Sequence, residues 1–358
     1  MYLYNDIRVV HLEVTQKCQA SCPMCDRNQN GGLVNPHISL AELSLEDCKK
    51  IFEPAFIKQL DYMYMCGNLG DPIIAKDTLE IFEYFRKHNP NMKLSMNTNA
   101  GARDGNWWRE LARIMGSRGM VRFSIDGLED TNHIYRKGVV WDNVLVSITN
   151  YINAGGHAIW DYLVFDHNEH QVEQAREFAR SIGVKQFVVK KTSRFYSTAK
   201  TETKDKHTVQ DRKGNEQYNL IPSKIDNTLS NKINTTIDKH GNLSNYYDTT
   251  EINCKVKEQK SIYITAEGLA MPCCWTASRM YKWWHKDPKV EQIWQFIKEA
   301  DTISVLKHGI EAVLNSNVFT DIEKSWGLPS IADGKLKVCS EKCGKEFDPF
   351  KDQFINVK

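Results

Sequence analysis

Three cysteines near the N-terminus are spaced as ligands of one metal centre. Cys18, Cys22 and Cys25 follow an apolar run at 8–14 and lie in a stretch that continues to about residue 43. Thiolates are the usual ligands of iron-sulfur clusters, and a four-iron cluster held by only three of them keeps one iron without a protein ligand. That iron could bind a small molecule, so we expect chemistry to begin there. The stretch that holds the three cysteines is longer than about 15 residues, and loops of that length are usually functional or disordered.

A second group of five cysteines lies in the C-terminal third, as Cys254, Cys273, Cys274, Cys339 and Cys343. Their clustering suggests a second metal site. Zinc is the other interpretation of both groups, with His11 or His37 as the fourth ligand of the first. Cys48 is predicted to be a buried core thiol.

The segments that must position these cysteines alternate between short β-rich runs and amphipathic helical stretches. This alternation predicts a parallel sheet covered by helices. Ser44 and Asp47 form a predicted capping box for one helix, and Asp77 is the predicted cap of another, which Pro90 stops. The expected strands are 8–14, 62–65, 93–98, 120–125, 158–165 and 185–189.

Six such units favour an α/β fold, either a partial (β/α)6 TIM-like barrel or an open doubly wound sheet, with a smaller C-terminal α+β domain. In both, functional residues gather at the carboxyl ends of the strands. We expect the barrel over 1–190, a polar linker or capping segment over 191–250, and an auxiliary-cluster domain over 251–358. Within the last, the apolar run at 262–264, followed by Gly268 and the pair Cys273 and Cys274, predicts a hairpin. The stretches 290–300 and 310–326 are predicted to be helical.

The cysteine triplet after the first strand of such a series resembles the radical S-adenosylmethionine (radical SAM) superfamily. The resemblance implies that Cys18, Cys22 and Cys25 hold a [4Fe-4S] cluster whose open iron binds SAM. An electron from the cluster then cleaves SAM to a 5′-deoxyadenosyl radical, which removes a hydrogen atom from the substrate. An electron donor of the flavodoxin or ferredoxin type is implied as a partner.

Four further segments resemble the family's SAM-binding motifs in the same order along the chain. Residues 66–72, Cys-Gly-Asn-Leu-Gly-Asp-Pro, resemble its Gly-Gly-Glu-Pro segment, with Asp71 in place of Glu. Thr-Asn-Ala at 98–100, Ser-Ile-Asp-Gly at 124–127 and Tyr-Arg-x-Gly at 135–138 resemble the others, and the arginine could pair with the SAM carboxylate as a fork. The implied SAM contacts are Met24, where the family often has an aromatic residue, Gly67, Asn68, Gly70, Asp71, Asn99, Ser124, Asp126, Arg136 and Val164.

The C-terminal cysteines resemble the twitch domain, the shortened form of the SPASM domain, which binds one auxiliary [4Fe-4S] cluster. The resemblance implies four ligands, for which we choose Cys254, Cys273, Cys339 and Cys343; Cys274 is the spare or an alternative to Cys273. In related enzymes such a cluster can accept an electron from a substrate radical, so the resemblance favours an oxidative outcome, a dehydrogenation or a crosslink. It could instead only shape the substrate pocket. The aromatic group Trp275, Tyr281, Trp283 and Trp284 either screens this cluster from water or belongs to the core and domain interface.

Two residues are candidates for direct catalytic roles. Glu13 alternates with apolar neighbours on the first strand, so its carboxylate could face substrate and move a proton, and Cys66 ends the second strand near the expected SAM site. Ordinary packing is the alternative for both, as it is for Tyr62 and Tyr64.

Composition bounds the remaining possibilities. The 358 residues carry 47 Lys and Arg against 45 Asp and Glu, so no overall field attracts nucleic acid or an anionic membrane. No apolar run approaches the roughly 18 residues of a membrane span and residues 1–10 lack a signal-peptide pattern, so a cytoplasmic enzyme is expected. We expect the substrate to be a small polar molecule or a carrier-presented peptide, because relatives that modify peptides often have a recognition domain ahead of the barrel and the first strand here is expected near residue 8. A non-catalytic electron carrier or zinc-stabilised module is the alternative of another class.

Overall fold

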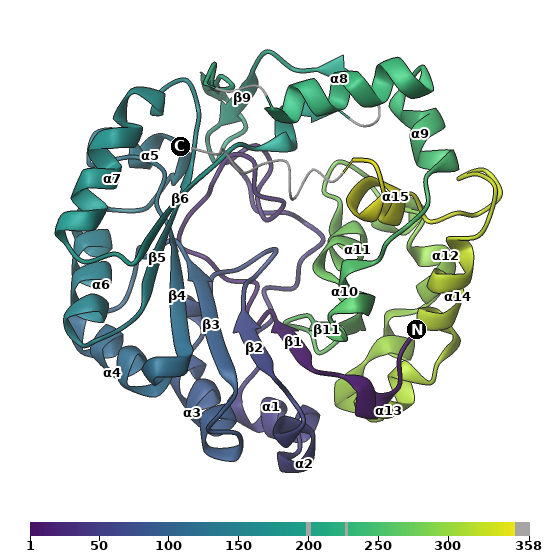
Figure 1. Cartoon of the computed structure of the whole chain (residues 1–358), viewed down its shortest axis with the longest axis horizontal. Helices are drawn as coiled ribbons and strands as arrows, with labels where there is room; N and C mark the ends of the chain where they lie inside the picture. Colours follow the sequence, from purple (N-terminus) through teal and green to yellow (C-terminus); the bar gives the residue numbers. More distant parts are fainter. Residues whose placement is uncertain (198–201, 226–227, 348–358) are drawn as a thin grey trace.

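The computed structural model describes residues 1–197, 202–225 and 228–347. Its main feature is an eight-stranded sheet in the order β12-β11-β1-β2-β3-β4-β5-β6. Neighbouring strands from β11 to β6 are parallel, and only β12 runs antiparallel to its partner. Strands β1 to β6 follow one another around an arc (Figure 1). The predicted α/β fold with a mostly parallel sheet is therefore confirmed, and among the described residues β12 and β6 are its two edges.

All six predicted strands are present, with small differences at their ends. They are β1 (Val9–Leu12), β2 (Tyr62–Met65), β3 (Lys93–Thr98), β4 (Gly119–Ser124), β5 (Ala158–Leu163) and β6 (Gln186–Lys190). Along β2 and β4 buried side chains alternate with half-exposed ones. One face of the sheet is thus packed against helices, while the other keeps contact with solvent.

The helices between these strands lie on the outer side of the arc (Figure 1). They are α1 (Leu45–Ile51), α2 (Pro54–Lys58), α3 (Thr78–His88), α4 (Gly105–Met115), α5 (Asn132–Tyr135), α6 (Trp141–Asn153) and α7 (Val172–Ser181). Each of the longer ones buries an apolar stripe at helical spacing, such as Ile81, Phe82 and Phe85 of α3. Cys48 of α1 is fully buried, as predicted.

The capping predictions are confirmed for one helix and corrected for another. Ser44 and Asp47 form the reciprocal capping box of α1. Asp77 is the residue before α3, but its side chain makes no bond to that helix. Its carboxylate instead accepts a 2.9 Å hydrogen bond from the backbone N–H of Leu45, an unpaired donor in the first turn of α1.

The predicted hairpin in the C-terminal third joins the barrel sheet. It consists of β11 (Ser261–Ile264) and β12 (Ala270–Met271). Strand β11 pairs in parallel with β1, and Tyr263 lies opposite His11. The division of the chain at residue 251 stays a prediction, but this hairpin packs as part of the same sheet as the first six strands.

The polar segment 191–250 is more structured than a linker. It forms short strands and two helices: β7 (Tyr196–Ser197), β8 (Glu202–Thr203), β9 (His207–Gln210), β10 (Glu216–Leu220), α8 (Thr228–His240) and α9 (Leu243–Thr249). The hairpin β9–β10 contacts the loop from Thr15 to about Leu43, which contains Cys18, Cys22 and Cys25 (the cysteine loop). Gln210 N–H donates to the Asn30 carbonyl at 2.9 Å, and His207 Nε2 pairs with the Pro23 carbonyl. The described part of this segment therefore contacts that loop, and its assignment as a linker or a capping segment stays a prediction.

The C-terminal helices are shorter than predicted. Residues 290–300 hold one helical turn, α12 (Trp294–Ile297), and 310–326 falls across two helices, α13 (Val305–Leu314) and α14 (Asn317–Ser325). The others are α10 (Lys255–Glu258), α11 (Cys274–Ser278) and α15 (Lys337–Cys343). None of the helices in the described ranges has the length and apolar character needed to cross a membrane.

Candidate functional site

Each cysteine of the N-terminal triplet contacts a different motif at the carboxyl edge of the sheet. The Asn99 side chain donates to Cys18 Sγ at 3.5 Å, and Arg136 Nη1 approaches Cys22 Sγ at 3.9 Å. The Cys25 thiol donates to the backbone carbonyl of Asn68 at 3.8 Å. The structure therefore brings together three sulfurs and three of the four segments that were matched to SAM-binding motifs.

The environment of these thiols suits a bound cationic centre. Burial raises the pKa of all three, to about 11 for Cys25, and Cys22 acts on both of the others as a neighbouring charge. Thiolates so deprived of water need a metal or a proton to balance them. A [4Fe-4S] cluster would be held by Cys18, Cys22 and Cys25, and the donor set fits it.

Each histidine of the zinc alternative uses one ring nitrogen in a hydrogen bond to a backbone carbonyl. His11 Nε2 pairs with the Cys66 carbonyl at 2.6 Å, and His37 Nε2 pairs with the His285 carbonyl at 2.7 Å. In the parts of the chain that the structure describes, no three His, Cys, Asp or Glu side chains converge tightly enough for one ion. Cluster ligands need not converge in this way, because four irons hold them apart.

The loop after β2 depends on glycine at two positions. A Cβ atom on Gly70 would lie 1.9 Å from the Thr15 carbonyl oxygen, and one on Gly67 would lie 2.3 Å from the Gly70 carbonyl oxygen. The backbone thus folds against the start of the cysteine loop more closely than any side chain permits. Burial raises the pKa of Asp71 to about 6, and its carboxylate accepts from Asn99 N–H at 2.7 Å, which joins this loop to the end of β3.

Asp126 and Arg136 form an ion pair at the end of β4. Arg136 Nε donates to Asp126 Oδ2 at 2.6 Å, and the other carboxylate oxygen accepts from Leu163 N–H at 2.6 Å. The prediction assigned the guanidinium fork to the SAM carboxylate. In the structure Arg136 donates from Nε to Asp126, and its Nη1 approaches Cys22 Sγ. Asp126 therefore orients the arginine.

Three other predicted contact residues lie at the same edge. Ser124 ends β4 and is half-exposed, whereas Val164, just after β5, is 2% exposed, and Met24 is buried beside the cysteines. Their part in SAM binding stays a prediction.

Glu13 and Cys66 occupy neighbouring strand ends but have different surroundings. The Glu13 carboxylate is 1% exposed and accepts from Leu69 N–H at 2.6 Å and from the Tyr263 hydroxyl. Burial raises its pKa to about 7. Glu13 therefore anchors the loop after β2, while burial raises the pKa of the Cys66 thiol to about 12 beside Glu13 and Lys190.

The four chosen C-terminal cysteines line one pocket. Cys254 and Cys273 precede α10 and α11, and Cys339 and Cys343 are one helical turn apart on α15. Their spacing of four residues places both on one face of that helix. The Cys274 side chain is not part of this lining; it lies within electrostatic range of Cys273, Cys66 and Glu13.

The aromatic group predicted near the auxiliary site divides. Trp275 lines the pocket and Tyr281 is buried elsewhere, whereas the Trp284 side chain is 51% exposed. Trp326, which the sequence did not single out, also lines the pocket. Its buried Nε1–H finds no oxygen or nitrogen acceptor among the described residues and lies beside the Cys339 thiol, whose pKa is raised by burial. A sulfur-rich group would satisfy that donor.

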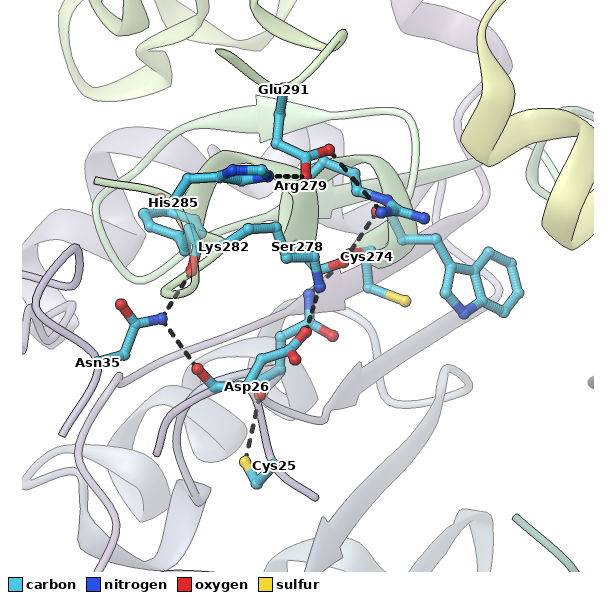
Figure 2. A network of polar contacts seen from close by, with 12 residues as sticks. Cys25, Asp26, Asn35, Cys274, Ser278, Arg279, Lys282, His285 and Glu291 are labelled. Carbon is cyan, nitrogen blue, oxygen red and sulfur yellow. Dashed lines mark hydrogen bonds and ion pairs between the residues drawn. The ribbon is translucent and has the colours of Figure 1, made fainter. Parts of the chain in front are cut away.

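The cysteine loop is tied to the C-terminal third by contacts that the sequence analysis missed. Lys282 Nζ donates to Asp26 Oδ2 at 2.5 Å, and the Asn35 side chain donates to the carbonyls of Asp26 and Tyr281 at 2.9 and 2.7 Å. In Figure 2 Asp26 lies between Cys25 and Lys282. These polar residues have no local pattern that would have identified them.

Comparison with known proteins gives a family match over the first half of the chain. Residues 12–179 match the model of the radical SAM superfamily. No curated protein matches the chain in sequence.

Solved structures match much more of the chain. Histidine-tagged anSMEcpe with bound AdoMet is 12% identical, with a TM-score of 0.57 over 97% of this chain and 92% of its own. Native anSMEcpe with AdoMet and the Kp18Cys peptide is 12% identical, with a TM-score of 0.56 over 96% and 95%. Streptococcus suis SuiB bound to S-adenosylmethionine is 13% identical, with a TM-score of 0.53 over 94% and 73%. In a structure of SuiB alone, the match spans 61% of that chain.

Proposed function

The chain belongs to the radical SAM superfamily, and from that membership we propose that the enzyme cleaves SAM reductively and removes a hydrogen atom from a polar substrate. The observation that carries the proposal is the contact of each N-terminal cysteine with a different SAM-type motif. When bound, the [4Fe-4S] cluster and SAM supply the electron and the 5′-deoxyadenosyl radical. A flavodoxin- or ferredoxin-type protein is the proposed reductant.

In this proposal, side chains and backbone of the chain bind the cluster and orient SAM. Cys18, Cys22 and Cys25 are the proposed cluster ligands. Glu13 and Asp71 fix the loop after β2, so that its backbone at Gly67–Gly70 can lie against SAM without an intervening side chain. The remaining proposed SAM contacts are Met24, Asn68, Asn99, Ser124, Asp126, Arg136 and Val164.

We further propose a second cluster in the pocket lined by Cys254, Cys273, Cys339 and Cys343. Its support is the shared pocket and the buried indole N–H of Trp326. A second cluster could accept an electron from a substrate radical, which favours an oxidative product, a dehydrogenated or crosslinked one. The α+β character proposed for the twitch-type domain agrees with β11, β12 and the helices after them.

Two substrate classes follow. A small polar molecule is the leading one. A carrier-presented peptide is the second candidate, because one of the similar folds, that of anSMEcpe, was solved with a bound peptide. The mass shift and the modified position on candidate substrates discriminate the two.

Anaerobic reconstitution tests the proposal. We expect about eight irons per chain, four in each cluster, and formation of 5′-deoxyadenosine with a reductant. Cys22→Ala should abolish that product, whereas the buried but remote Cys48→Ala should keep it. Zinc in place of iron, or no SAM cleavage by the iron-loaded protein, would favour the electron carrier or zinc-stabilised module.

A further inference from the structure

The inner, helix-free face of the sheet carries a cluster of charged side chains that the SAM motifs do not use. Asp161 of β5 accepts from Arg122 Nη1 of β4 at 2.9 Å through one carboxylate oxygen. Its other oxygen accepts from Lys190 Nζ of β6 at 2.7 Å. Two cations thus share one carboxylate.

This cluster lies next to the proposed SAM site. Ser124 and Asp161 are register partners in the β4–β5 pair, and Arg122 is two residues before Ser124 on the same face of β4. Asp126 lies within electrostatic range of Asp161, and Lys190 and Asp161 both act on the Cys66 thiol. Asp161 is thus level with Ser124, Arg122 lies one row of side chains below it, and Lys190, the register partner of Leu163, lies one row above. A group bound between the two cations would therefore lie at the proposed SAM-binding edge.

The cluster is also open to a ligand. The side chains of Arg122 and Lys190 are 32% and 20% exposed, whereas that of Asp161 is only 8% exposed. A guanidinium has five N–H donors, and among the described residues no acceptor other than Asp161 is found for that of Arg122. Its free donors have the geometry that binds carboxylate or phosphate.

The nearby carboxylates have partners of their own. Asp126 is paired with Arg136, and Glu13 is buried, bonded to Leu69 and Tyr263, with its pKa raised to about 7. Beside the cluster, Tyr62 and Tyr64 are stacked with ring centroids 5.1 Å apart, and His11 stacks on Tyr64 at 4.3 Å. One side of the face is therefore cationic and the other aromatic.

From this arrangement we propose that Arg122 and Lys190 bind an oxyanion of the substrate, a carboxylate or a phosphate, on the same face of the sheet as the stacked rings of Tyr62 and Tyr64. The proposal rests on the proposed function and narrows its polar substrate to an anionic one. Arg122 is a specificity-determining residue in this scheme, and Asp161 is a positioning residue that holds both cations and limits their charge.

A purely structural ion pair is the alternative, and the two interpretations predict opposite results for one variant. Asp161→Asn removes the negative charge but keeps the shape, so an anion-binding role predicts tighter anion binding. A structural role predicts lower stability and no gain. Arg122→Gln should weaken anion binding at least tenfold, whereas Arg118→Gln should not change it, because Arg118 precedes β4 at its amino end and bonds to the Asn91 carbonyl.

The experiment is a thermal-shift titration of the reconstituted full-length enzyme with SAM present. Inorganic phosphate is one probe and N-acetylaspartate the other, at constant ionic strength, because excluded salts stabilise proteins nonspecifically. We expect a saturable shift with at least one probe, which identifies the source, with the stated changes in the variants. Formation of 5′-deoxyadenosine without substrate should persist in Arg118→Gln.

Two outcomes overturn the inference: no saturable shift with either probe, or equal anion affinity in wild type, Arg122→Gln and Asp161→Asn. Should Arg122→Gln fail to fold, the anion affinities of Asp161→Asn and Arg118→Gln relative to wild type test the inference without it. Loss of SAM cleavage in the wild-type enzyme would instead contradict the proposed function, so the two failures are distinguishable.

Discussion

The side-chain amide of Asn68 donates a 2.7 Å hydrogen bond to the backbone carbonyl of Cys274. The same residue offers its own carbonyl to the thiol of Cys25. One asparagine in the loop after β2 therefore touches both the proposed SAM-cluster loop and the segment beside the proposed auxiliary cluster. The two sites are linked through a single residue of the loop that Glu13 anchors.

Replacing Asn68 with Ala should loosen the C-terminal site more than it lowers global stability. The substitution leaves the Cys274 carbonyl without its donor, at a cost of about 1 kcal/mol. Hydrogen-deuterium exchange should accelerate in 273–278 and stay unchanged in α4, and the exposed Asn91→Ala is the matched control. Unchanged exchange in 273–278 would show that the bond does not couple the sites.

Adjacent cysteines should differ sharply in their effect on the metal content. Cys273 lines the auxiliary pocket, whereas Cys274 is not part of its lining. Cys273→Ser should therefore reduce the iron from about eight to about four per chain, because one cluster loses a ligand, whereas Cys274→Ser should keep about eight. Iron and sulfide analysis after identical anaerobic reconstitution measures this, and the reverse result would assign Cys274 as the ligand.

The strands could be predicted from the sequence because each is a short β-rich run with turn residues beside it. The ends of β2 and β3 were predicted to the residue. What local pattern cannot supply is the partner of a strand: β11 lies some 250 residues from β1 in the chain, and its parallel pairing with β1 depends on the whole fold. The same limit explains why the sequence predicted no helix in 191–250, which was expected to be a polar linker or capping segment, since its helices are mostly polar.

For the candidate site, motif order predicted which segments meet, but not how. Asn99 reaches Cys18 and Arg136 reaches Cys22, as neighbouring motifs should. The supporting contacts were missed because they join single polar residues far apart in the chain, such as Asp26 and Lys282 or Glu13 and Tyr263. Such pairs carry no spacing signal.

Gly70→Ala should abolish SAM binding with little loss of secondary structure. The new Cβ would lie 1.9 Å from the Thr15 carbonyl oxygen, so the loop after β2 must move away from the cysteine loop. We expect SAM affinity, measured by equilibrium dialysis with the reconstituted protein, to fall more than tenfold. Gly327→Ala is the control, because its nearest neighbour would be 3.7 Å away. Normal affinity in Gly70→Ala would contradict the proposed place of SAM.

Lys282→Ala should destabilise the contact between the cysteine loop and the C-terminal third. It leaves the Asp26 carboxylate without its buried cation, and because that carboxylate is 33% exposed we expect a cost of about 1–3 kcal/mol. Urea unfolding measures the loss, with the exposed Lys286→Ala as control. Adding Asp26→Asn to Lys282→Met should recover part of the stability, and a double variant no better than Lys282→Ala would argue against an ion-pair role.

Stability should depend on pH through Glu13. Burial raises its pKa from the usual 4.5 to about 7, so between these values the folded protein keeps a proton that the unfolded chain has released. The folded state binds more protons there, and stability therefore falls as pH rises through this window and stays lower above it. The Glu13→Gln variant does not lose stability in this way. Its free energy of unfolding, relative to that of wild type, should therefore rise by up to about 3 kcal/mol between pH 5 and pH 8. Denaturant unfolding of the full-length protein at both pH values measures the difference, and Glu46→Gln, whose carboxylate is 71% exposed, should show no such gain. A Glu13→Gln difference that is the same at pH 5 and pH 8 would mean that the anchoring carboxylate does not change its charge in this range.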